Sequence, residues 1–98
     1  MTTATLDTNV LGASAAQLAL TTETTVTLYV VPGAGDHENH RVTLEFSPDS
    51  GTTWIASRET VNGQPNAMTV DVVATDVRAC VCEAEGTAST STVHILAR

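Results

Sequence analysis

HRVTLEFSPDSGTTW, residues 40–54, is the stretch that decides the fold. Val42, Leu44 and Phe46 alternate with polar residues, which is the period of a strand that buries one face. The PDSG that follows supplies residues that close turns between strands. Trp54 then begins the return strand as a large apolar side chain. The stretch therefore predicts a β-hairpin with these four apolar side chains directed into the core.

The same alternation recurs along the chain, with short turns between the runs. Threonine and valine are plentiful and lysine is absent, a bias that suits strands. Residues 13–20 also fit a short helix, and residues 1–12 an extended N-terminal arm. We expect strands at 24–31, 40–47, 54–59, 67–74, 77–84 and 89–97, with a further strand near 4–11. The prediction is one all-β domain over residues 1–98, an antiparallel, immunoglobulin-like β-sandwich of about seven strands.

The net charge of the chain argues against two classes of binding partner, nucleic acids and anionic membranes. Four basic against 11 acidic residues give a formal net charge of −7. Nucleic-acid binding depends on lysine and arginine neutralising phosphates, and an anionic membrane would repel the chain, so we expect neither partner. No signal peptide and no apolar run of about 20 residues is visible, which predicts folding in the cytoplasm with both cysteines initially as thiols.

The turn of the hairpin carries a recognisable short motif. Ser47, Asp49, Gly51, Thr53 and Trp54 stand in the order of the Asp-box hairpin, which this stretch resembles. In sialidases and other β-propellers that box is a folding element distant from the active site, and it recurs from blade to blade. It occurs once here. The resemblance implies a structural hairpin, and sugar binding through an exposed tryptophan is the alternative.

No catalytic constellation emerges from the spacing of reactive residues. His37 and His40 lie three apart in the polar stretch 36–41, one residue short of the zinc-protease spacing, so a solvated loop is favoured over a metal site. No Ser-His-acid set can be assigned, and the PGAG at 32–35 lacks the lysine and helix of a phosphate loop. We predict a protein that is not an enzyme and has no cofactor.

The strand expected at 77–84 is apolar on both faces, although a sandwich strand needs only one buried face. One face carries Val77, Ala79 and Val81, and the other carries Cys80, Cys82 and Ala84. The second face is covered either by another subunit or partner, or by long neighbouring side chains of the same chain.

About three-quarters of the chain resembles small β-sandwich proteins encoded among the structural genes of tailed bacteriophages. The features that carry the resemblance are Leu28–Gly33, the hairpin Ser47–Trp54, Val77–Arg78, Glu85–Gly86 and a last strand rich in threonine and serine. It implies a virion structural protein, most simply a decoration or cement protein made in the host cytoplasm. Such a protein binds the major capsid protein lattice on the capsid surface in many copies, where avidity compensates for weak single contacts.

Two surfaces are predicted to make those contacts, namely the N-terminal arm, which could add a strand to a neighbour, and the cysteine face. The expected contact residues are Thr5, Leu6, Val10, Leu11, Cys80 and Cys82. Residues 24–31 or the last strand could serve instead if either lies at a sheet edge, and a homo-oligomer is a further expectation. The alternatives are a neck or tail accessory protein of the virion, or a small carbohydrate-binding or adhesion module.

Overall fold

A computed structural model describes residues 1–35, 40–62, 66–84 and 89–98. Over these ranges the chain forms strands and turns with no helix, and hence nothing helical that could cross a membrane. The strands are β1 Thr2–Asp7, β2 Ser14–Ala19, β3 Thr25–Gly35, β4 Arg41–Ser47, β5 Ile55–Ala56, β6 Val61–Asn62, β7 Asn66–Asp71, β8 Asp76–Glu83 and β9 Ser89–Ala97. Seven of them correspond to predicted strands, and β2 and β6 are additional.

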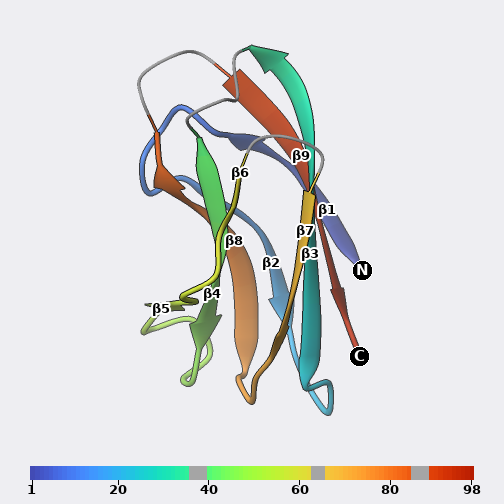
Figure 1. Ribbon diagram of the computed structural model, residues 1–98. Helices are drawn as coiled ribbons and strands as arrows, with labels where there is room; N and C mark the ends of the chain where they lie inside the picture. The colour runs from blue at the N-terminus through green and yellow to red at the C-terminus, as the bar shows by residue number, and fades with distance from the viewer. Residues whose placement is uncertain (36–39, 63–65, 85–88) are drawn as a thin grey trace.

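The strands form two layers, which Figure 1 shows edge-on. Sheet A has four strands in the order β1-β9-β3-β7, and sheet B has the order β2-β8-β4-β5, with β6 pairing with β4 as well. Every pairing is antiparallel. The predicted all-β antiparallel sandwich is therefore confirmed.

The core lies between the layers and follows the alternation of the sequence. Leu28 of β3 is fully buried and stands opposite Ile95 of β9 and Met68 of β7 in sheet A. In sheet B, Leu44 of β4 stands opposite Ala79 of β8, and both are buried. The remaining buried apolar residues of the core are Leu6, Leu20, Val26, Val30, Val42, Phe46, Val61, Val77, Val81 and Val93.

The alternative of a helix at residues 13–20 is wrong, because this segment is β2 at the edge of sheet B. Small residues without a clear period leave helix and strand indistinguishable locally, and pairing with β8 decides between them. The register shifts between Ala15 and Leu18, and Ala16 has a positive φ of 61°. This irregularity bends the strand and makes the edge of sheet B a poor template for a further strand.

The N-terminal segment is not a free arm. Thr2 to Asp7 pair with Ile95 to Thr90 of β9, so β1 is an edge strand of sheet A. Leu6 is 1% exposed and belongs to the core, because side chains alternate along β1 and this one points inward. Its predicted role as a contact residue is therefore wrong.

Candidate docking surfaces

The hairpin that joins β4 to β5 is held by its own side chains. Ser47 is fully buried, and its Oγ accepts hydrogen bonds from the backbone N–H groups of Asp49 at 3.3 Å and Gly51 at 2.8 Å. The Asp49 carboxylate accepts the N–H of Thr53 at 2.7 Å. The hydroxyl and amide of Thr53 hold the pKa of Asp49 below its ordinary value. The four polar or glycine positions of the motif thus make one closed turn.

Thr75, just before β8, fastens this turn to the rest of the sandwich. Its hydroxyl donates to the Ser47 carbonyl at 3.1 Å and accepts the N–H of Ser50 at 2.7 Å. Its own N–H donates to the same Ser47 carbonyl at 2.8 Å. Ser50 and Gly51 both have positive φ, at 60° and 94°, which lets the chain reverse here. The hairpin end is therefore rigid enough to present a fixed surface.

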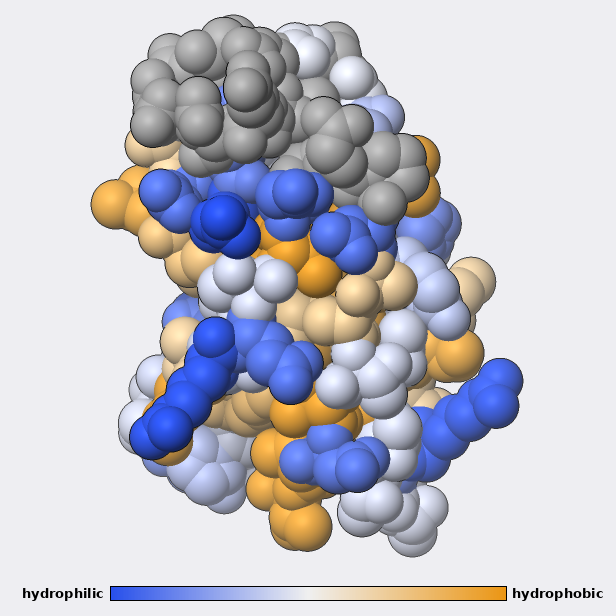
Figure 2. Space-filling model, in the orientation of Figure 1, coloured by the Kyte–Doolittle hydropathy of each residue, from blue (hydrophilic) through white to orange (hydrophobic). Residues whose placement is uncertain are grey.

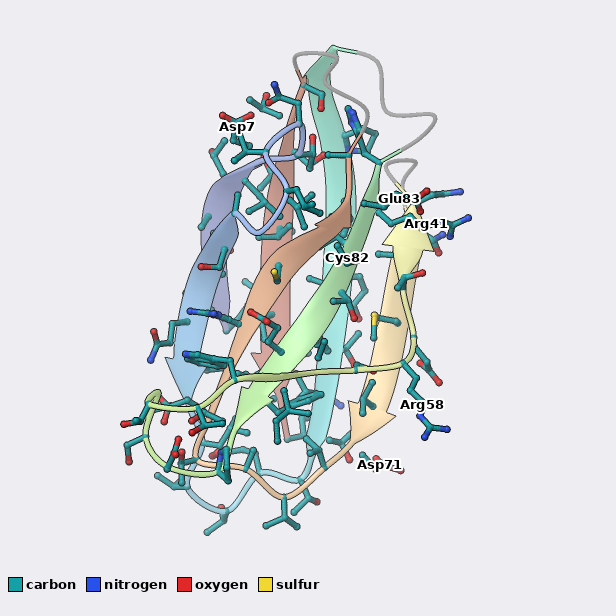
Figure 3. The ribbon with its side chains drawn as sticks, turned by 90° about the vertical axis from the view of Figure 1, so that its left-hand side faces the viewer. Asp7, Arg41, Arg58, Asp71, Cys82 and Glu83 are labelled. Carbon is teal, nitrogen blue, oxygen red and sulfur yellow. The ribbon has the colours of Figure 1, made fainter. Side chains whose placement is uncertain are left out.

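Trp54 does not lie in the core, contrary to the prediction. It is half-buried on the outer face of sheet B, where the Arg78 guanidinium lies 4.1 Å from the centre of its ring. Arg78 also forms an ion pair with Glu45 at 2.8 Å. The strand predicted at 54–59 pairs with β4 only at Ile55 and Ala56, and the chain then crosses the outer face of sheet B (Figure 3). Ile55 is paired with the inward residue Phe46, so Trp54, one position earlier, points to the opposite, outer face.

The crossing segment explains what covers the second apolar face of β8. Thr43, opposite Cys80 in the sheet, is 1% exposed and donates to the Glu59 carbonyl at 2.6 Å. Cys80 is buried, and desolvation together with nearby Glu45 raises its pKa to about 11. This part of the face is therefore covered by the chain itself.

Cys82 has a different environment from Cys80. It is exposed and lies at the end of β8 beside the ion pair of Arg41 and Glu83, which measures 3.0 Å (Figure 3). The register of β4 and β8 shifts at this point, so Cys82 has no direct partner across the sheet. Partial desolvation of the sulfur raises the pKa of Cys82, so this thiol is accessible to a reagent but is not activated.

We expect Cys82 of the native protein to react first with a thiol reagent such as Ellman's reagent, and Cys80 to react at least about tenfold more slowly because it is buried. In guanidinium chloride both thiols should react at the same rate. The measurement is the absorbance time course, with Cys82→Ser as the control that removes the fast phase. A fast phase that survives in Cys82→Ser would contradict the burial of Cys80.

The predicted histidine pair lies partly outside the described residues, because His37 falls in 36–39. His40 is 1% exposed, and its Nδ1 is 2.7 Å from the Oγ of Ser89. Ser89 is in turn 2.5 Å from the hydroxyl of Thr8. His40 is thus part of a buried hydrogen-bond chain that joins both sheets. Within the described ranges no group of three or more His, Cys, Asp or Glu side chains could hold a metal ion.

An apolar groove lies beside the hairpin at one end of the sandwich. It has a volume of about 190 Å³. At its rim Ile55 is 60% and Val73 88% exposed, an unusual exposure for aliphatic residues that lie together. Figure 2 shows the apolar surface at this end, over the connection between β7 and β8. The lining residues are Phe46, Ser47, Pro48, Ile55, Ala56, Val72, Val73 and Ala74.

The outer face of sheet A is a second surface, and it was not predicted as one. It is defined here as the outward residues of β1, β9, β3 and β7. Tyr29 and Val31 are 43% and 47% exposed in its centre. Its members, in strand order, are Thr3, Thr5 and Asp7; Thr90, Thr92, His94 and Leu96; Thr25, Thr27, Tyr29 and Val31; and Ala67, Thr69 and Asp71.

The remaining predicted contact residues do not form one surface. Thr5 lies on the outer face of sheet A, whereas Cys80 and Cys82 lie on that of sheet B. Val10 and Leu11 are 47% and 68% exposed in the turn from β1 to β2, at the end opposite the hairpin (Figure 1). Ile55 and Val73 were not predicted as a site, because alternation describes each strand separately and does not show that the two side chains lie together.

No protein-family model matches this chain, and no curated protein matches it. Among solved structures, the SPBc2 prophage-derived protein YomS has a similar fold, with a TM-score of 0.51 over 96% of this chain and 93% of that chain. The two sequences are 7% identical, so the likeness concerns the fold.

Proposed function

We propose that this chain is a non-enzymatic structural protein of a phage virion that decorates the capsid by binding the lattice of major capsid protein. The observation that carries the proposal is the likeness in fold to a prophage-derived protein over nearly the whole of both chains. The resemblance of its strand and turn sequences to phage structural proteins supports the same class. A decoration protein needs a stable small module with a fixed contact surface, and avidity over the lattice supplies the rest.

The apolar groove beside the hairpin is the contact surface that fits this function best. Its rim residues Ile55 and Val73 are exposed, and the hydrogen bonds of Ser47, Asp49 and Thr75 fix the backbone that carries the groove. A preformed apolar site loses little conformational entropy on docking. The turn with Val10 and Leu11 is the competing surface at the other end.

The alternative virion role is that of a neck or tail accessory protein, which copy number on the particle separates from decoration. A carbohydrate-binding role is less well supported, because Arg78 occupies one face of the Trp54 ring at 4.1 Å. Sugar rings dock on open aromatic faces.

Co-sedimentation with undecorated capsids of a tailed phage that encodes this chain tests the proposal. Wild type should bind saturably at a fixed ratio to the capsid subunit. Val73→Asp should weaken binding at least about tenfold, since it places a charge in an apolar contact. Leu11→Asp, the same charge at the opposite end, is the matched control and should bind as wild type does.

Two outcomes would change these conclusions. If Leu11→Asp loses binding and Val73→Asp keeps it, the docking surface is the turn from β1 to β2, and decoration stands. If wild type does not sediment with capsids, but instead with isolated tails or necks in few copies per particle, the decoration role is wrong and the accessory role replaces it.

A further inference from the structure

We propose that the outer face of sheet A binds a second copy of this chain, face to face, around a two-fold axis that runs parallel to the strands between β9 and β3. The proposal concerns the chain's association with itself. It does not depend on the function proposed above.

The distribution of charge over the two layers points to this face. The outer face of sheet B carries two ion pairs, Arg78 with Glu45 and Arg41 with Glu83. On the outer face of sheet A the described residues of the three central rows, built around Leu96, His94 and Thr92, include no carboxylate, lysine or arginine, and Asp7 and Asp71 lie in the end rows. Two chains that each carry a charge of −7 repel one another, so they associate most readily through a face without acids at its centre.

The side chains of this face are already ordered by contacts across the strands. The Thr27 and Thr69 hydroxyls are 3.0 Å apart, and the Thr3 hydroxyl is 2.9 Å from the Nδ1 of His94. Threonine is also stiff about its first side-chain torsion. Docking a second copy on such a face therefore costs little side-chain entropy.

The register of the sheet defines what would meet across the axis. With the order β1-β9-β3-β7, the axis places β9 over β3 of the other copy and β1 over its β7. His94 then faces Tyr29 of the second copy, and Leu96 faces its Thr27, because these residues are partners in the β3–β9 register. Aromatic and aliphatic side chains thus lie at the centre, as in the cores of interfaces.

Charge complementarity at one end supports the same axis. Arg98 lines a depression on this face together with Thr25, Thr27, Tyr29 and Leu96. The axis brings Arg98 over Thr25 of the second copy, whose hydroxyl donates to Asp71 at 2.9 Å. Arg98 forms no ion pair within the described part of its own chain, so it can reach this carboxylate across the axis, twice in each dimer.

The expected affinity follows from the size of the face. Four strands about 4.8 Å apart and seven residues long at about 3.3 Å each give a footprint of roughly 400 Å². Two such footprints bury about 800 Å² in total, which is less than stable interfaces bury, so a weak, transient dimer with a dissociation constant of about 100 μM is expected.

Sedimentation equilibrium of the full chain from about 1 μM to 1 mM tests the proposal. Wild type should shift from monomer to dimer over this range. Tyr29→Glu should raise the dissociation constant at least about 100-fold, because it replaces the aromatic ring at the centre by a carboxylate that must lose its water on docking. Thr52→Glu, which adds the same charge in the exposed hairpin turn, is the matched control and should dimerise as wild type does, apart from the small effect of added net charge.

A charge exchange tests the axis itself. Arg98→Asp and Asp71→Arg should each weaken the dimer about three- to tenfold, and the double variant should recover most of the loss. Circular dichroism shows whether each variant is folded. The proposal is overturned if wild type stays monomeric at 1 mM, or if Tyr29→Glu and Thr52→Glu dimerise equally. Failure of the double variant to recover would exclude this axis.

Discussion

Leu28→Ala should lower the free energy of unfolding by about 3 kcal/mol, the largest effect expected of a single apolar truncation in this chain. Leu28 is fully buried at the middle of β3 and stands opposite the buried residues Met68 and Ile95. The substitution removes three buried carbon atoms, so their transfer free energy is lost and a cavity remains between the sheets. Because β3 is paired with a strand on each side, the surrounding structure can close this cavity only partly. For a domain of this size the loss corresponds to a fall in melting temperature of roughly 12–24 °C.

Urea unfolding followed by circular dichroism measures this loss, with the slope compared between variants to ensure that the same surface is exposed. Leu11→Ala is the matched control, since it deletes the same atoms from a side chain that is 68% exposed. It should change stability by less than about 0.5 kcal/mol. Equal losses in the two variants would mean that Leu28 is not at the centre of the core.

The core was predictable because it depends on local alternation. Val42, Leu44 and Phe46 alternate over a whole strand, and the turn residues after them stop that strand at one place. Every second residue of a strand points to the same face, so the inward positions can be found without knowing which strand lies beside it. The same alternation runs through β3 and β9, where Leu28 and Ile95 are fully buried.

Positions that depend on distant parts of the chain were not predictable in this way. The segment that became β2 has small residues without a period, and only its pairing with β8 makes it a strand. Trp54 carries the apolar signal of a core residue, but the register of β5 with β4 places its ring on the outer face of sheet B, against Arg78. Local propensity predicts neither the strand at β2 nor the outer position of Trp54, since contacts with distant parts of the chain determine both.

The face of sheet A was missed for another reason. Its residues alternate with core residues, and in each strand alone they look like an ordinary outward set of threonines with a few larger side chains. The absence of charge at the centre becomes visible when the register sets Thr3, His94, Tyr29 and Ala67 in one row. Strand order, which sequence alternation does not give, was the missing information.

Ser89→Ala should lower the free energy of unfolding by about 2–3 kcal/mol, although it removes one oxygen atom. The Ser89 hydroxyl is 2.5 Å from that of Thr8 and 2.7 Å from the Nδ1 of His40, and the exposed fractions of the three residues are 4%, 0% and 1%. Without this hydroxyl, the Thr8 hydroxyl and the His40 Nδ1 each lose a hydrogen bond in a buried place. Losing a buried partner costs more free energy than an average hydrogen bond contributes to stability. Thr8 and Ser89 lie at the ends of sheet A strands, and His40 precedes β4 of sheet B. The Ser89 hydroxyl therefore joins the two layers, and its removal breaks this connection.

A double-mutant cycle in urea separates this coupling from packing. Thr8→Val keeps the shape of the side chain and should cost about 1 kcal/mol, and the double variant should lose about 1 kcal/mol less than the sum because the two hydroxyls no longer need one another. Thr90→Ala, at the exposed next position of β9, is the control and should stay within about 0.5 kcal/mol of wild type. Strict additivity in the cycle would show that the two hydroxyls act independently, and a Ser89→Ala variant as stable as Thr90→Ala would show that this chain of hydrogen bonds does not hold the layers together.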